Sequence, residues 1–125
     1  MSPITLTVRD ETTAGDALAE LELQLEAEET TVAELIRARV HQEVRAHNAS
    51  GDARFSGLVA PAERQLNQRR TVDADAQTAV ALRAFERGHV LVLVDDRQVE
   101  ALEQPVTLRP GSTVTFLKLV PLVGG

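Results

Sequence analysis

The sequence has no cysteine, tryptophan or tyrosine among its 125 residues. Without cysteine there is no disulfide framework, no thiolate-bound zinc and no thiol nucleophile. The only aromatic side chains are Phe55, Phe85 and Phe116, so the surface has no stacking platform of the kind that single-stranded nucleic-acid-binding proteins use. The apolar fraction is 43%. We therefore expect one domain with an aliphatic core, which a chain of this length can bury.

Basic charge is also scarce, with 13 Lys and Arg against 19 Asp and Glu and a net charge of −6. This balance argues against nucleic acid or an anionic membrane as a partner, and Arg69-Arg70 is too small a basic cluster for a nucleic-acid footprint. No stretch approaches the roughly 20 apolar residues of a membrane-spanning helix. The first residues carry neither a basic leader nor an apolar signal core, and we expect a cytoplasmic protein.

The beginning of the chain predicts a β-hairpin. Apolar and polar side chains alternate over Ile4–Arg9 with the period of two that is typical of a strand with one buried face. Asp10–Asp16 has the Asp, Thr and Gly composition of a turn. Ala17–Ala27 again alternates, although its Leu and Glu residues are good helix formers. Because periodicity is the stronger signal, we predict a second, antiparallel strand.

A helix is predicted next, from Thr31 to about His47. Thr31 and Glu34 have the spacing of a capping box, in which a hydroxyl and a carboxylate satisfy the unpaired amide groups of a helix start. The following apolar residues recur at helical spacing and are expected to cover the hairpin; they are Val32, Leu35, Ile36, Val40 and Val44.

The region from 48 to 88 differs in character from both ends of the chain. Asn48–Thr71 is polar and contains Gly51, Gly57 and Pro61, as expected of a long connection or insertion, which could hold a short helix around 61–67. A second helix is predicted from about Val72 to Arg87. Gly88 is suited to end it in the left-handed conformation.

The last part of the chain predicts strands and tight turns. His89–Val94 is a continuous apolar run, as in a central strand buried on both faces. Asp95-Asp96-Arg97 is turn-like and is followed by a short pairing segment at Gln98–Glu100. After a tight turn at Arg109-Pro110-Gly111, Ser112–Val120 is predicted as the last long strand.

The end of the chain resembles the ubiquitin-like β-grasp superfamily. The resemblance is carried by the turn Leu108-Arg109-Pro110-Gly111, the last strand, the stretch Pro121-Leu122-Val123 and the terminal Gly124-Gly125. The likeness is greatest to its prokaryotic branch of small sulfur carriers and bacterial and archaeal ubiquitin-like modifiers. Residues 4–47 resemble the family in the order of their predicted strands and helix, and residues 89–125 resemble it in their sequence motif. Residues 48–88 have no counterpart in the compact members of the family. The likeness implies an α+β fold, a β-grasp with a mixed sheet packed on a main helix, here with an inserted loop and second helix.

The resemblance implies that Gly125 is the reactive residue. An activating enzyme would use ATP to adenylate its carboxylate, and the acyl group would pass to sulfur as a thiocarboxylate, or to an enzyme thiol and then to a target amine. No bound cofactor is expected. Gly124 and Gly125 suit this chemistry because residues without side chains can enter a narrow channel and present an unhindered carbonyl.

The residues before the diglycine are apolar, where solvated side chains would be usual near a chain end. One interpretation is a last strand that continues into the sheet. The other is a flexible tail, 119–125, that a partner buries, with Pro121 preventing ordinary strand pairing. The expected contact residues for the activating enzyme, together with the exposed face of the final sheet, are Leu119, Val120, Pro121, Leu122 and Val123. Further partners could include a conjugating enzyme and a deconjugating protease.

Other candidate sites are weak. His41 and His47 are six positions apart, which does not suit a shared metal ion, and His89 lies far along the chain, so no metal site is predicted. A group of acidic residues is expected to be a solvated face, with a basic partner enzyme as the alternative; it comprises Glu20, Glu22, Glu26, Glu28 and Glu29. No combination of residues predicts catalysis.

Lys118 is the only lysine. If Gly125 is activated, the chain can accept its own carboxyl group only at Lys118 or at the amine of Met1. The scarcity of lysine therefore predicts single attachments. The resemblance implies a carrier or modifier and not an enzyme, and the 48–88 insertion, which makes the chain larger than a minimal sulfur carrier, favours a protein modifier. The alternatives are a sulfur carrier for cofactor biosynthesis and a non-conjugating β-grasp interaction module.

Overall fold

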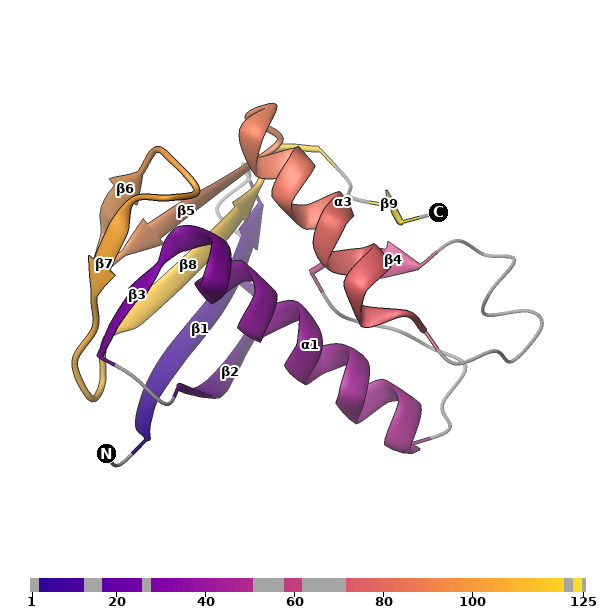
Figure 1. Cartoon of the computed structure of the whole chain (residues 1–125), viewed down its shortest axis with the longest axis horizontal. Coiled ribbons are helices and arrows are strands. Elements are labelled where there is room, and N and C mark those ends of the chain that lie inside the picture. The colour runs from indigo at the N-terminus through magenta and orange to yellow at the C-terminus, as the bar shows by residue number, and fades with distance from the viewer. Residues whose placement is uncertain are drawn as a thin grey trace.

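A computed structural model describes residues 3–12, 17–25, 28–50, 58–61, 72–120 and 123–124. Within these ranges the protein has an α+β fold with a mixed sheet and two helices (Figure 1). The elements are β1 (Ile4–Thr12), β2 (Ala17–Leu25), β3 (Glu29–Thr31), α1 (Val32–Ser50), β4 (Ala60–Pro61), α3 (Ala74–Glu86), β5 (Val90–Val94), β6 (Arg97–Val99), β7 (Pro105–Thr107), β8 (Thr113–Lys118) and β9 (Val123–Gly124).

The main sheet has five strands in the order β2-β1-β8-β5-β6. β1 pairs with β2 as the predicted antiparallel hairpin, and β5 forms a second hairpin with β6. Between the two hairpins, β8 runs parallel to β1 and antiparallel to β5. The first and last long strands of the chain are therefore neighbours near the middle of the sheet.

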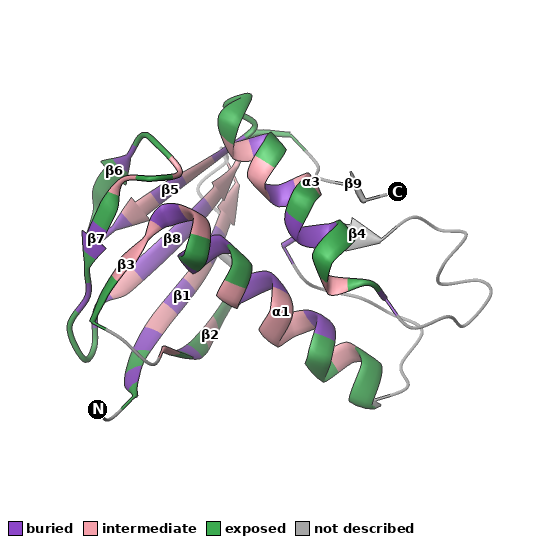
Figure 2. Ribbon diagram, in the orientation of Figure 1, coloured by how far each residue is buried: buried purple, intermediate pink, exposed green. Residues whose placement is uncertain are grey.

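α1 packs on the sheet through the predicted apolar stripe, all five residues of which are buried. In Figure 2 buried segments recur along α1, and buried segments also alternate with less buried ones along β1 and β8. α3 packs beside α1, and its buried side chains are Gln77, Thr78, Ala81 and Ala84. The opposite face of the sheet has no helix on it in the part of the chain that is described (Figure 1).

Two features of the strands differ from the sequence-based expectation. β1 does not end before Asp10 but continues to Thr12, and Asp10 is buried at 2% exposure. The turn prediction was wrong for 10–12, because Asp10 pairs with an arginine in the core; the rest of the predicted turn, 13–16, lies outside the described residues. β5 is not buried on both faces: Val90, Val92 and Val94 are buried, whereas Leu91 and Leu93 are half-buried. Only one face of this strand lies under the helices.

The predicted end of the second helix and the predicted turn before β8 are confirmed. Gly88 has φ +75° after the end of α3, and Gly111 has φ +86° in the turn before β8. In that turn the amide of Ser112 donates to the carbonyl of Arg109 at 2.9 Å. Pro110 followed by a residue with positive φ is typical of a type II turn, where glycine avoids strain. These turns set the entry points of β5 and β8.

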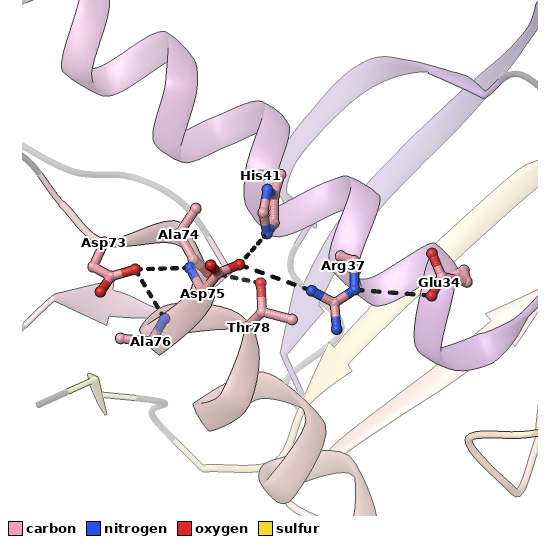
Figure 3. Close-up of polar contacts among 8 residues, drawn as sticks. All are labelled: Glu34, Arg37, His41, Asp73, Ala74, Asp75, Ala76 and Thr78. Carbon is pink, nitrogen blue, oxygen red and sulfur yellow. Dashed lines mark hydrogen bonds and ion pairs between the residues drawn. The ribbon is translucent and has the colours of Figure 1, made fainter.

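The second helix is confirmed as α3, and it has a well-formed start. The Asp73 carboxylate accepts hydrogen bonds from the amides of Asp75 (2.9 Å) and Ala76 (3.2 Å). Asp75 then faces α1, where its carboxylate lies 3.2 Å from His41 Nε2 and 3.9 Å from Arg37 Nη1 (Figure 3). Of the short helix suggested around 61–67, Pro61 lies in β4 and the rest lies outside the described residues.

A small antiparallel sheet covers the start of α1. β3 pairs with β7, in the register Glu29↔Thr107 to Thr31↔Pro105. Thr31 is therefore both the last residue of a strand and the cap of α1, since its hydroxyl accepts from the amide of Glu34 at 3.2 Å. The sequence predicted the cap but not the strand pair.

Candidate functional site: the C-terminal segment and its contacts

The C-terminal segment leaves the sheet directly after β8. The amide of Leu119 still donates to the carbonyl of His89 at 2.9 Å. Its side chain is 39% exposed, however, and that of Val120 is 42% exposed. They are the exposed large hydrophobic residues among those described. The first two predicted partner contacts thus lie on the surface.

The end of the segment has a second contact with the protein. Pro121, Leu122 and Gly125 lie outside the described residues, but Val123 and Gly124 form β9. β9 pairs in parallel with β4, in the register Ala60↔Val123 and Pro61↔Gly124, and lies beside α3 (Figure 1). β4 belongs to the 48–88 insertion, so the insertion meets the segment that ends in the diglycine.

β4 is attached to the core through the residues before it. Leu58 and Val59 are each only 2% exposed. The amide of Leu58 also donates to Glu43 Oε2 of α1 at 2.9 Å. Further along the insertion, Val72 exchanges two hydrogen bonds with the side chain of Asn48, at 2.9 and 3.0 Å. The insertion is thus fastened to α1 at two places.

Glu43 belongs to a group of three charged side chains between α1 and the sheet. Arg39 Nη2 lies 2.6 Å from Asp10 Oδ2 and 2.5 Å from Glu43 Oε1. The Arg39 side chain is fully buried, and its guanidinium carbon is 5.0 Å from the centroid of the Phe116 ring. Burial raises the pKa of Glu43, an effect that the nearby Arg39 opposes. Together these residues join β1, α1, β8 and the insertion.

Lys118 lies at the end of β8, where it pairs with Val90 of β5. It is half-buried and, by the alternation of a strand, lies on the same face as Phe116. Its charge is also close enough to lower the pKa of Glu43, against the larger effect of burial. The predicted self-acceptor is therefore beside the buried charges.

The uncovered face of the sheet carries a group of leucines. Leu91 of β5 is paired with Leu117 of β8, and Leu93 is the next residue of β5 on that face. All three are half-buried, and the exposed Leu119 continues the row beyond β8. We call these four residues the leucine patch. It is the apolar part of the exposed sheet face that the sequence analysis named as a partner surface.

Charged residues border the leucine patch on the β1–β2 side. Arg9 of β1 lies 3.6 Å from Glu11 and 3.8 Å from Glu20. Glu22, on the same face of β2, is exposed, as are Glu28 and Glu29; Glu26 lies outside the described residues. The acidic run therefore includes a solvated strand face, as expected.

The three histidines lie apart from one another in the part of the chain that is described. His41 pairs with Asp75, the carbonyl of His89 accepts from Leu119, and His47 lies near the end of α1. Within the described ranges, no three His, Asp or Glu residues are grouped as a metal ion would need. Among those same residues, no helix is long and apolar enough to cross a membrane.

The buried charges were not predicted, although the sequence contains a signal for them. Arg39 follows Leu35 and Ile36 at helical spacing, and Asp10 continues the inward positions of Ile4, Leu6 and Val8 in β1. Opposite charges at inward positions of two elements indicate a buried pair. The pairing of β4 with β9 has no such signal, because four residues of ordinary composition form it.

Neither a protein-family model, nor a curated protein, nor a solved structure matches this chain.

Proposed function

We propose that this protein is a ubiquitin-like modifier of the β-grasp type, activated at the carboxylate of Gly125. The observation that carries the proposal is the position of β8, which leads into Gly124-Gly125. It lies parallel to β1, between a hairpin on each side, with α1 across one face of the sheet. The order of hairpin, capped helix and late strands agrees with what the sequence resemblance implies, and this agreement supports the β-grasp assignment.

The proposed chemistry takes place at the C-terminal carboxylate, in the site of a partner enzyme. A carboxylate oxygen of Gly125 bonds to the α-phosphorus of ATP, and pyrophosphate leaves. A thiolate of the enzyme attacks the acyl carbon, and AMP leaves. A target amine then displaces the thiolate and loses a proton, which gives an amide. This chain supplies the acyl group and a recognition surface; the partner supplies the nucleotide site and the nucleophile.

The leucine patch and the exposed Val120 form the proposed recognition surface. They are continuous with the strand that carries the diglycine, so an enzyme bound there is well placed to receive the C-terminus. Burying half-exposed leucines removes apolar surface from water, which favours such a complex. The acidic residues beside the patch, Glu20 and Glu22, favour a partner with basic residues around its apolar contact.

The test of the function is a reconstituted reaction followed by intact mass. The full chain is incubated with ATP and the ubiquitin-type activating enzyme encoded in the same genome. We expect an acyl-adenylate or an enzyme thioester at Gly125, and no product from a variant that lacks Gly125 but keeps the circular dichroism spectrum of the parent. An unchanged mass with a competent enzyme contradicts the proposal. The mass of the protein isolated from its own cells tests whether it ends at Gly125.

The same reaction tests the recognition surface. Leu93→Gln is expected to raise KM for activation at least tenfold, because it places an amide in the apolar contact. Thr5→Gln, at an exposed position on the same sheet face, is the matched control and should change KM little. Equal KM values for the two variants would show that the enzyme does not bind the patch.

One observation favours a second candidate, a non-conjugating β-grasp interaction module. Val123 and Gly124 are paired with β4, as in a C-terminus that has a structural role. In that case deletion of Gly125 leaves partner binding unchanged. A sulfur carrier is distinguished from the modifier and from the interaction module by its reaction product. If a sulfur donor is added to the reconstituted reaction, the carboxylate of a sulfur carrier becomes a thiocarboxylate.

A further inference from the structure

We propose that β4 is an intramolecular clasp that holds the C-terminal segment in a closed state, from which it must detach before Gly125 can react. The consequence for activation rests on the proposed function, whereas the docking of the segment on β4 can be tested without it. In the closed state the clasp pairs Ala60 with Val123 and Pro61 with Gly124.

The closed state and activation compete for the same backbone. Gly124 is the residue before the reactive one, and a strand partner occupies one edge of its backbone. An enzyme channel that accepts an extended C-terminus must approach that backbone closely, as in other cases where an extended segment is bound through its main chain. Both partners cannot use the same edge of Val123 and Gly124 at once. Pairing with β4 therefore excludes entry into the channel.

The stationary half of the clasp is β4. Leu58 and Val59, directly before it, are buried in the core, and the Leu58 amide is bonded to Glu43. Glu43 is in turn paired with the buried Arg39. On the other side, β9 follows the exposed Leu119 and Val120. Opening should therefore move the C-terminal segment away from β4, and leave β4 attached to α1.

The clasp is short enough to open reversibly. It contains two residue pairs, and Pro61 has no amide hydrogen to donate. Each remaining hydrogen bond adds little net stability, because water can replace it when the strands separate. Only molecules in the open state can be activated, so the rate of activation falls as the fraction of closed molecules rises. An enzyme that binds the open state shifts the equilibrium between closed and open molecules towards the open state.

The absence of cysteine permits a direct test. Ala60→Cys and Val123→Cys place two thiols at paired positions of neighbouring strands, within the Cα separation that a disulfide needs. The oxidised protein is locked closed, and reduction releases it. The control is Thr5→Cys with Gln24→Cys, paired across β1 and β2 and outside the clasp.

The first readout is access to the C-terminus, measured as the rate at which a carboxypeptidase removes Gly125 and Gly124. In the variant with Ala60→Cys and Val123→Cys, called the clasp pair, we expect oxidation to slow this rate at least about tenfold and reduction to restore it. In the variant with Thr5→Cys and Gln24→Cys, called the control pair, oxidation should leave the rate unchanged. Equal rates in the oxidised and reduced clasp pair overturn the proposal. So does amide hydrogen exchange of Gly124 in the parent protein at the rate of an unstructured peptide.

The second readout is activation by the partner enzyme with ATP. Slower adenylation of the oxidised clasp pair, restored by reduction, supports the clasp and the proposed function together. If the parent protein is never adenylated while carboxypeptidase access still depends on oxidation, the proposed function fails and the clasp remains. Equal adenylation of the oxidised and reduced forms overturns the clasp and leaves the proposed function standing.

Discussion

Arg39 and Asp10 form an ion pair inside the core, with 2.6 Å between Nη2 and Oδ2 and almost no exposure of either side chain. The pair connects the middle of α1 to β1. Glu43 shares the same guanidinium nitrogen, and Phe116 of β8 lies against the guanidinium plane. Removing charges from water is costly, so taking away one member of such a group leaves a buried charge without compensation.

Replacing Arg39 by alanine is therefore expected to lower the free energy of unfolding by roughly 3–5 kcal/mol, since it leaves Asp10 buried without a positive partner. Urea denaturation followed by circular dichroism measures this. Arg37→Ala is the matched control, because Arg37 is on the same helix but about half exposed, with ion pairs of 3.8 and 3.9 Å. Its expected effect is below about 1 kcal/mol.

A double variant distinguishes the pair from the size of the side chain. Arg39→Met with Asp10→Asn removes both charges, and we expect it to be more stable than Arg39→Met alone. If the two single changes were simply additive, the ion pair would have no role in stability.

Glu43 gives a pH dependence with a defined sign. Its pKa in the folded protein is raised above the ordinary 4.5, chiefly by burial, with Arg39, Asp10 and Lys118 as the charged neighbours. The folded state thus favours the protonated form, and that contribution to stability is present below pH 4.5 and lost as the pH rises through the folded pKa. Wild type should lose stability relative to Glu43→Gln as the pH increases from 4.5 towards neutrality.

Urea unfolding of both proteins at several pH values gives this difference directly. Glu103→Gln, at an exposed position, controls for the removal of one negative charge. If the stability of wild type relative to Glu43→Gln stayed constant, or rose, as the pH increased, the raised pKa would be contradicted.

Two substitutions in the turn between β5 and β6 are expected to change the stability of the protein in opposite directions. Asp95 and Asp96 both have positive φ, of 47° and 68°, as a two-residue hairpin turn requires. Asp96→Gly should raise the free energy of unfolding by up to about 1 kcal/mol, because glycine adopts this conformation without strain. Asp95→Gly should instead lower it by about 1–2 kcal/mol, because the Asp95 carboxylate accepts from the Thr113 amide and the Ser112 hydroxyl.

Thermal unfolding of the two variants side by side is sufficient, since both make the same substitution in the same turn. If both variants were stabilised, backbone strain would outweigh the Asp95 hydrogen bonds; if both were destabilised, strain at Asp96 would have no measurable role.

Lys118→Arg tests where the protein can accept its own C-terminus. In the reconstituted reaction we expect any self-linked product of the parent to map to Lys118 or to the N-terminal amine by peptide mass spectrometry. The variant keeps the positive charge near Glu43 and should lose the Lys118 linkage alone. Abundant self-linkage at any other residue contradicts the prediction.

Periodicity predicted most of the fold. The alternation of Ala17–Leu25 outweighed its helix-forming composition, and the segment is β2. The capped start and apolar stripe of α1, and the second helix that ends before Gly88, were also predictable from local patterns. Local patterns could not show that β5 would be covered on one face only, which depends on where both helices lie. For the same reason they could not show that the insertion reaches the C-terminal segment.

The pairing of β1 with β8 also determines when the core can form during synthesis. The strand that completes the middle of the sheet is separated from its partner by about a hundred residues, and contacts this distant in sequence form slowly. A ribosome-bound chain can make the first hairpin and α1 early, but their apolar faces stay open until residues 113–118 have emerged from the exit tunnel. Folding is therefore completed only after β8, the strand that leads into the diglycine, has left the ribosome.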